Sequence, residues 1–255
     1  MSTDLNVSVG TVAGAPLSLH DVLRGLHRHR HLLPLLKEAA AERVLLQHAA
    51  REELSVSDTE LQQAADQFRH RHGLSGAEQT HRWLAREGLT IEDFEAGLER
   101  ELLLAKLKQH LTGPQVANRF HARRDRYARA ALRLIVVASE GIGRELLAQI
   151  IEEGQDFAAL ARKHSLHGPS RLAGGSLGVV ARYDLPADAA DAVFAASPGN
   201  VVGPLPGPDG FRLILVEELL PPELDDETQE VIRQELFDAW LNDRLREVRI
   251  DVSWL

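Results

Sequence analysis

The sequence predicts an α+β protein in which a helical first part is followed by a smaller mixed domain and a closing helix. Apolar residues recur at helical spacing through most of residues 17–111, which is typical of packed amphipathic helices. From residue 131 onward, β-branched apolar runs alternate with short helical segments and with turns rich in glycine and proline. A last helical pattern follows Pro221 and Pro222.

The first part is expected to begin with a short strand and turn over residues 5–16, where apolar residues alternate around two glycines. Ser18 and Asp21 have the spacing of a capping box, so the first helix should begin there. Further helices are expected over 32–54, 57–72, 77–87 and 91–111. Ser57 and Thr90 are the expected N-caps of the second and fourth of these.

The second domain is predicted to have the element order β-α-α-β-α-β-β over about 90 residues. Its strands are expected over 131–137, 177–180, 201–203 and 211–216, and its helices over 144–153, 157–164 and 188–196. A loop rich in glycine, proline and serine occupies 165–176. We therefore expect a helical domain over 1–128 and a mixed domain over 129–221.

The final helix, expected over 224–246, has an apolar side that includes Leu236 and Trp240. Such a side needs a surface to bury against. We expect it to pack back on the helical domain, which residues 222–255 would then complete. The tail, 248–255, is expected to be a strand.

Composition and charge exclude several kinds of function. A net charge of -9 disfavours a general binder of nucleic acid or of anionic membranes. The chain has no cysteine, which removes disulfides, thiolate catalysis and cysteine-ligated metals. No run approaches the roughly 18 apolar residues that span a bilayer, and residues 1–10 lack the pattern of a signal peptide. We expect a cytoplasmic protein that binds neither nucleic acid nor membrane.

Three short motifs suggest sites that their context disfavours. The turn at 139–143 lacks the third glycine of a dinucleotide-binding fingerprint, since Leu146 stands there. Residues 174–178 match G-x-S-x-G but lead into a strand, whereas a nucleophile elbow leads into a helix. His27 and His31 are expected one helical turn apart, but zinc needs at least three protein ligands. We expect no cofactor and no metal.

A more specific pattern runs through the second half. A helix ends in His164-Ser165, a Pro/Ser loop follows, and Gly-Gly-Ser-Leu-Gly occupies 174–178. Further segments follow in order at matching spacing, over 185–194, 198–204 and 210–214. This half resembles the parvulin-type prolyl isomerases, which implies an FKBP-like parvulin fold.

The first half is similar to the SurA/PpiC-type N-terminal domain, notably over 45–49, 56–61 and 86–94. The resemblance covers nearly the whole chain, because the final helix returns to the N-terminal domain in that family. It implies an all-helical chaperone-like domain joined to a prolyl isomerase, or rotamase, domain.

The resemblance also implies where the parvulin site lies. Such a site lowers an amide rotation barrier of ~18–20 kcal/mol by favouring the twisted amide over the planar one. The two strand histidines of the family fall on Arg133 and Arg212, and its loop Asp or Cys falls on His167. The residues expected to bind substrate are Leu185, Ala189, Phe194 and Ser176.

Two arginines and a histidine would therefore converge at a site that cannot titrate like the family's, since arginine stays protonated. The domain either persists as a binding module or keeps some isomerase activity through pocket shape alone. Arg133 and Arg212 are also candidates for a carboxylate-binding pair. The alternatives are that they pair internally with an acid such as Asp209, or that they extend into solvent.

We expect a folding or maturation chaperone that holds extended client polypeptide, including proline-containing segments. The helical half would supply an apolar cradle, and the parvulin-like domain a second contact surface. The alternatives are an active prolyl isomerase with an unusual site, and a dedicated maturation factor or scaffold for one client protein or peptide.

Overall fold

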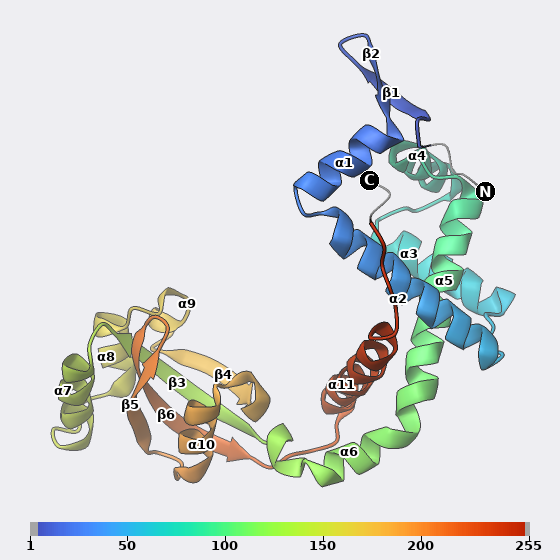
Figure 1. Ribbon diagram of the computed structural model, residues 1–255. Coiled ribbons are helices and arrows are strands. Elements are labelled where there is room, and N and C mark those ends of the chain that lie inside the picture. Colours follow the sequence, from blue (N-terminus) through green and yellow to red (C-terminus); the bar gives the residue numbers. More distant parts are fainter. Residues whose placement is uncertain (1–4, 253–255) are drawn as a thin grey trace. The chain divides into compact units, whose positions relative to one another are not determined.

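The computed structural model describes residues 5–252, and the contacts among them divide the chain into two units (Figure 1). The helical unit consists of the described residues up to Pro114 together with those from Arg233 onward. The mixed unit consists of Gln115–Ile232. From the sequence, these boundaries were expected after residues 128 and 221, so the contacts assign two further segments, 115–128 and 222–232, to the mixed unit.

In the described part of the helical unit, a short hairpin precedes five helices. The hairpin pairs β1 (Ser8–Val12) with β2 (Ala15–Ser18), and the helices are α1 (Leu19–Arg28), α2 (Leu32–Arg51), α3 (Asp58–Arg71), α4 (Ala77–Glu87) and α5 (Ile91–Thr112). The expected N-caps are confirmed as capping boxes, formed by Ser18 with Asp21, Ser57 with Glu60 and Thr90 with Asp93. In each box, side chains bind backbone N–H groups that have no partner within the helix.

The helix near the chain end, α11 (Asp226–Leu245), returns to the helical unit. The buried core there consists of Leu45, Ala49 and Leu107, against which Phe237, Trp240 and Leu241 pack. The ring of His48 in α2 meets Trp240 edge-on, with 4.8 Å between the ring centroids. The expected return of this helix is confirmed.

The tail after α11 does not form the expected strand over residues 248–252. Val248 and Ile250 instead line a groove together with Lys37 and Ala40 of α2. A strand needs another strand to pair with its backbone groups, and the neighbours of this tail are helices. Residues 253–255 of that prediction lie outside the described residues.

The mixed unit has the expected order of strands and helices. Its elements are α6 (Val116–Ala122), β3 (Arg129–Val137), α7 (Glu140–Ile151), α8 (Phe157–His164), α9 (Gly168–Arg171), β4 (Ser176–Ala181), α10 (Ala187–Ala195), β5 (Val201–Gly207) and β6 (Gly210–Leu220). The antiparallel sheet has the strand order β4-β3-β6-β5 (Figure 1). The short helix α9 lies within the segment that was expected to be a loop.

The last two strands extend further than expected, because they form one hairpin that closes at Gly207 and Gly210. The register is irregular between Val202 and Leu205, around Gly203, whose φ is 116°. Such a bulge lets a glycine and the following proline lie inside a paired strand. The strand therefore continues past the residues at which the sequence pattern had ended it.

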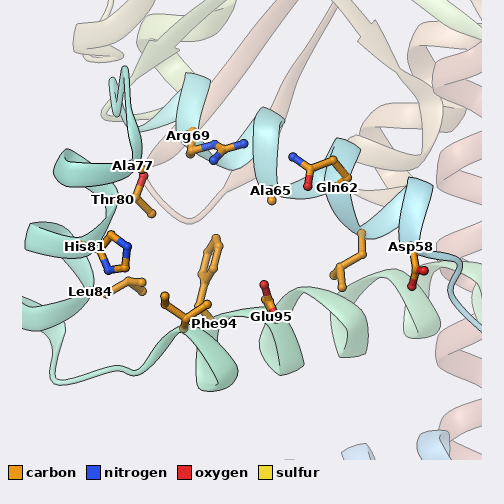
Figure 2. A pocket seen from close by; sticks show the side chains of 12 residues that line it. Asp58, Gln62, Ala65, Arg69, Ala77, Thr80, His81, Leu84, Phe94 and Glu95 are labelled. Carbon is orange, nitrogen blue, oxygen red and sulfur yellow. The ribbon is translucent and has the colours of Figure 1, made fainter.

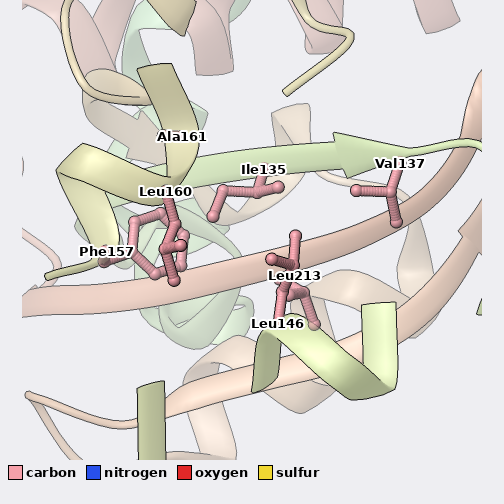
Figure 3. Close-up of a cluster of buried hydrophobic side chains, with 7 residues drawn as sticks. All are labelled: Ile135, Val137, Leu146, Phe157, Leu160, Ala161 and Leu213. Carbon is pink, nitrogen blue, oxygen red and sulfur yellow. The ribbon is translucent and has the colours of Figure 1, made fainter. Parts of the chain in front are cut away.

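The two faces of this sheet are covered by different helices. One face carries the cluster shown in Figure 3, which consists of Ile135, Val137, Leu146, Phe157, Leu160, Ala161 and Leu213. The other carries Ala130, Leu132, Ala189, Val193, Ile214 and Val216. We name them the α7/α8 face and the α10 face. Because side chains alternate along a strand, odd-numbered residues of β3 lie on the α7/α8 face and even-numbered residues on the α10 face.

Candidate functional site

Arg133 lies on the α7/α8 face and is engaged by its own domain. Its Nε donates to Oε1 of Glu217 at 2.6 Å, and its Nη1 donates to the carbonyl oxygen of Gly174 at 3.1 Å. The β3–β6 register skips Glu217, because Ala131 pairs with Glu218 and Leu132 with Val216. Arg133 thus has an internal acidic partner, and that partner is Glu217 rather than the expected Asp209.

Arg212 lies on the opposite face of the sheet. It pairs with Val136 across β3 and β6, whereas Arg133 pairs with Leu215. Positions 133 and 136 of β3 are an odd number of residues apart, so their side chains point to opposite faces. The expected convergence of the two arginines is therefore wrong, and so is the carboxylate-binding pair. A motif identifies residue types but does not give the pairing register that directs them.

His167 lies in the loop between α8 and α9, where two serine hydroxyls hold it. Its Nδ1 is 2.7 Å from Oγ of the buried Ser170. Oγ of Ser165, also buried, accepts the backbone N–H groups of His167 and of Val136, both at 3.2 Å. Ser165, the serine of the family-like His-Ser pair, therefore fastens this loop to the central strand.

The glycines that end this loop lie directly against neighbouring elements. A side chain at Gly175 would come within 2.6 Å of the carbonyl oxygen of Leu134, and one at Gly174 within 2.7 Å of Cβ of Ala158. Both glycines have positive φ, 82° and 65° respectively, which L-residues rarely adopt. The Gly-Gly pair therefore serves close packing of the loop on β3 and α8. Ser176, which follows, accepts the N–H of Gly178 at 3.4 Å and lies at the start of β4.

The residues expected to line the substrate pocket lie together on the α10 face. Ala189 is buried in the cluster there, and Leu185 and Phe194 pack against it half-buried. Since Ala189 is only 1% exposed, it supports the surface from below and does not contact a ligand directly. The structure thus groups Leu185, Phe194 and Arg212 on one face.

Arg182 is a neighbour of this face that the sequence motifs did not indicate. Its guanidinium lies over the ring of Phe194, 5.1 Å from the centroid, and pairs with Asp191 at 2.7 Å. It also lines a cavity of about 340 Å³ together with Leu185, Ala190 and Asp191. Arg182 lies in a turn between β4 and α10, outside every family-like segment, so only the folded structure shows its contact with the aromatic ring.

A second cavity, of about 320 Å³, lies in the helical unit between α3, α4 and α5 (Figure 2). Its apolar residues are Leu61, Ala65, Ala77, Leu84, Ile91 and Phe94, and its polar ones are Asp58, Gln62, Arg69, Thr80, His81 and Glu95. Phe94 also meets the ring of Phe68 edge-on, with 4.9 Å between the ring centroids, and Phe68 meets Trp83 in the same way at 5.1 Å. The sequence predicted an apolar cradle in this half but not these residues.

Hydrogen bonding shifts the pKa of two carboxyl groups, one in each unit. In the helical unit, Lys106 donates to Glu60 at 2.7 Å and, with the backbone N–H and hydroxyl of Ser57, lowers the pKa of Glu60 to about 2. In the mixed unit, Arg129 donates to Asp225 at 2.8 Å and holds the pKa of that carboxyl well below its usual range. Both carboxylates therefore stay ionised at neutral pH and hold secondary-structure elements together.

Residues 5–252 contain neither a cluster of metal-ligand side chains nor a membrane-spanning helix. No group of three or more His, Asp or Glu in that range is placed to hold a metal ion. His27 lies at the end of α1 and His31 immediately before α2, so the two are not one turn apart on a common helix. Within the same range, every helix is too short or too polar to cross a bilayer.

Comparison with known proteins identifies both units. Residues 33–108 match the model of the SurA-like N-terminal domain, and residues 138–218 match that of the PPIC-type PPIASE domain, a rotamase. The chain joins a SurA-like domain to a PpiC-type domain. The PpiC-type match includes His167 and Arg212 but begins after β3, so Arg133 lies outside it.

Relatives named chaperone SurA match more than half of this chain. The chaperone SurA of Xanthomonas campestris pv. campestris (strain 8004) is 28% identical over 185 residues, which are 65% of this chain and 40% of that protein. The chaperone SurA of Ralstonia nicotianae is 30% identical over 205 residues, 71% of this chain and 41% of that protein. The chain thus spans about two fifths of the length of these relatives. The crystal structure of the peptidylprolyl isomerase PrsA from Bacillus anthracis shows the same fold, with 22% identity, a TM-score of 0.54 and coverage of 85% of this chain and 99% of that one.

Proposed function

We propose that this protein is a folding or maturation chaperone that holds extended segments of client polypeptide, including proline-containing ones. The observation that carries the proposal is the presence of both domains, SurA-like and PpiC-type, in one chain. Relatives named chaperone SurA match the chain over 65% and 71% of its length. No cofactor is required, because holding a chain needs only complementary surface.

The cavity between α3, α4 and α5 supports a role in client binding. Its apolar lining, with the buried Leu84 and half-buried Phe94, suits the side chain of an apolar client residue. The polar groups around it, such as Gln62 and Thr80, can form hydrogen bonds with a client backbone. Ile91, which is 41% exposed, extends the apolar surface outward. Apolar lining with a few polar groups is usual for binding sites in proteins.

Filling this cavity tests the proposal. Wild-type protein is expected to suppress aggregation of a chemically denatured protein during refolding, measured by light scattering. Ala65→Phe places a ring in the cavity and should weaken suppression severalfold. Gln63→Phe is the control, since it adds the same ring on the same helix outside the cavity lining. Equal suppression by both variants would remove the cavity from the proposal, and no suppression by the wild type would contradict the chaperone function itself.

A second candidate function is catalysis of prolyl isomerisation, which the match to the rotamase domain favours. The positions that hold histidine in active parvulins hold Arg133 and Arg212 here, so catalysis would rest on the shape of the α10 face. Exchange spectroscopy on a short Xaa-Pro peptide measures it directly. Faster cis/trans exchange with the wild type establishes an isomerase, and an unchanged rate with folded protein restricts the domain to binding.

A third possibility is a factor dedicated to one client, and capture of clients from the native host separates it from a general chaperone. Many bound proteins indicate a general chaperone, whereas one indicates a dedicated factor. We also propose a cytoplasmic location, as expected from the sequence. Fractionation of the native host tests it, and recovery of the protein with exported markers would contradict it.

A further inference from the structure

Among the residues that the structure describes, Arg212 differs from Arg133, the other arginine of the expected site, in having no hydrogen-bond or ion-pair partner. Within residues 5–252, Arg133 is bound by Glu217 and by a backbone carbonyl, but no ion pair or hydrogen bond engages the Arg212 guanidinium. Arg212 is nonetheless half-buried. A guanidinium has five N–H donors, and removing it partly from water without acceptors is unfavourable. A half-buried guanidinium with unused N–H donors is suited to bind an acceptor from another molecule.

A glycine leaves room for this guanidinium. If Gly207 carried a Cβ, that atom would lie 2.6 Å from Cζ of Arg212 and also against Nε and Nη2. The arginine therefore lies flat against the backbone of Gly207, on β5. The φ of Gly207 is not in the left-handed region, so the backbone conformation itself does not require glycine. The absence of a side chain at Gly207 provides the space that the Arg212 guanidinium occupies in this structure.

Apolar side chains lie on the same face of the sheet as the cation. Leu205 pairs with Arg212 across the β5–β6 hairpin, on the same face. Leu134, Val202 and Leu205 pack half-buried against the α10-face cluster. A partly dehydrated guanidinium beside apolar groups attracts a carboxylate more strongly than one in open water, because the surroundings screen the charge less. Guanidinium also matches a carboxylate in geometry, through two parallel N–H···O bonds.

We propose that Arg212 is a client-binding residue that selects extended segments in which an acidic side chain lies next to an apolar one. The carboxylate binds the guanidinium, and the neighbouring apolar side chain packs on Leu134, Val202 and Leu205. Arg133 has no part in this recognition, because Glu217 occupies it from within. The inference rests on the proposed client binding and adds the chemistry that the PpiC-type domain recognises.

Two blocked peptides that differ by one group test the proposal on the full chain. The first is acetyl-Ala-Leu-Glu-Pro-Leu-Ala-amide, and the second has Gln in place of Glu. Wild type is expected to bind the Glu peptide about tenfold more tightly, as one charge-assisted hydrogen bond provides. NMR titration reads the affinity and the perturbed residues together. The preference should also shrink in high salt, because screening weakens ion pairs at the surface.

Three variants assign the preference to Arg212. Arg212→Gln should bind both peptides equally. Gly207→Ala should reduce the preference, because the new methyl group displaces the guanidinium without removing it. Arg133→Gln, a matched loss of one arginine on the opposite face, should keep the preference. The amide spectrum of each variant shows whether the domain remains folded.

Equal binding of both peptides by the wild type would overturn the inference, as would an unchanged preference in Arg212→Gln. A Gln peptide with a free C-terminus serves as a further arm, and tighter binding of it than of the blocked Glu peptide would also overturn the selection of side chains. Aggregation suppression by the same preparation separates the two levels. If the protein suppresses aggregation but does not prefer the Glu peptide, only the role proposed for Arg212 is contradicted. If it does not suppress aggregation, the proposed chaperone function is contradicted as well.

Discussion

The SurA-like helices and the PpiC-type domain are packed in different ways. In the PpiC-type domain, the single strand β3 has five buried residues, Ala130, Leu132, Ile135, Val136 and Val137. In the SurA-like domain, α3 has no buried residue and α4 has only Leu84. The space between α3, α4 and α5 stays partly open as the cavity in Figure 2. The sheet of the PpiC-type domain is filled around β3 by buried side chains, whereas the space between α3, α4 and α5 leaves room for a side chain from outside.

The largest expected change in unfolding free energy comes from a substitution in the buried cluster of the PpiC-type domain. Ile135→Ala removes a side chain with no exposed surface from the cluster in Figure 3, which should cost about 3–4 kcal/mol of unfolding free energy. Hydrogen exchange of the β3 and β6 amides measures it. Ile151→Ala, at a position that is 67% exposed, is the control and should change the free energy by less than about 0.5 kcal/mol.

A smaller change in unfolding free energy is expected for a substitution beside the cavity of the SurA-like domain. Leu84→Ala in α4 should cost about 2 kcal/mol, the lower end for such substitutions, because an existing cavity already borders Leu84. Tryptophan fluorescence in urea measures the unfolding of the helical unit, which contains Trp83 and Trp240. Leu89→Ala, at a position that is 40% exposed, is the matched control. A cost for Leu84→Ala as large as for Ile135→Ala would contradict the difference in packing between the two domains.

Two arginines of the PpiC-type sheet should also differ in their contribution to stability, because within residues 5–252 Arg133 has an ion-pair partner and Arg212 has none. Arg133→Gln breaks a partly exposed ion pair with Glu217 and should cost about 1 kcal/mol. Arg212→Gln should cost less than about 0.5 kcal/mol, because no partner within residues 5–252 is lost. Thermal unfolding of the two variants side by side measures the difference. A larger loss for Arg212→Gln than for Arg133→Gln would contradict the assignment of partners.

The smallest effect is a pH dependence in the SurA-like domain. The hydrogen bonds from Lys106 and Ser57 lower the pKa of Glu60 to about 2 in the folded state, from 4.5 ordinarily. A lowered folded pKa contributes stability above the ordinary value, and that contribution is lost as pH falls from 4.5 toward 2. Urea unfolding at pH 5 and pH 3 should show the loss in the wild type, and the loss should be smaller in Glu60→Gln. An equal loss in both would assign it to other groups.

Local signals made much of the fold predictable. Ser18, Ser57 and Thr90 each precede an acid by three residues, and that spacing alone marks a helix start. The order of elements in the PpiC-type domain followed from changes in apolar period. The strand at 201–203 was predicted too short, because the pairing that carries it past Gly203 comes from β6.

The site was less predictable, because it depends on register and on contacts between distant segments. Motif spacing placed Arg133 and Arg212 at the positions of the family's two strand histidines. The register of β3 against β6, however, directs their side chains to opposite faces of the sheet. The contact of Arg182 with Phe194 joins a turn to a helix, and the SurA-like cavity depends on how three helices meet. None of these relations is encoded within a short stretch of sequence.

The contacts that attach the α8–β4 loop to the rest of the domain limit which of its residues can change in evolution. Ser165 ties the loop to β3 through its hydroxyl, and Gly174 and Gly175 let it lie against Ala158 and Leu134. These residues belong to the sequence motif by which the domain resembles its family, and their role here is to hold the fold together. Residues that face a ligand can therefore change while the position of the loop stays the same. A lineage could therefore exchange its chemistry while keeping its family signature.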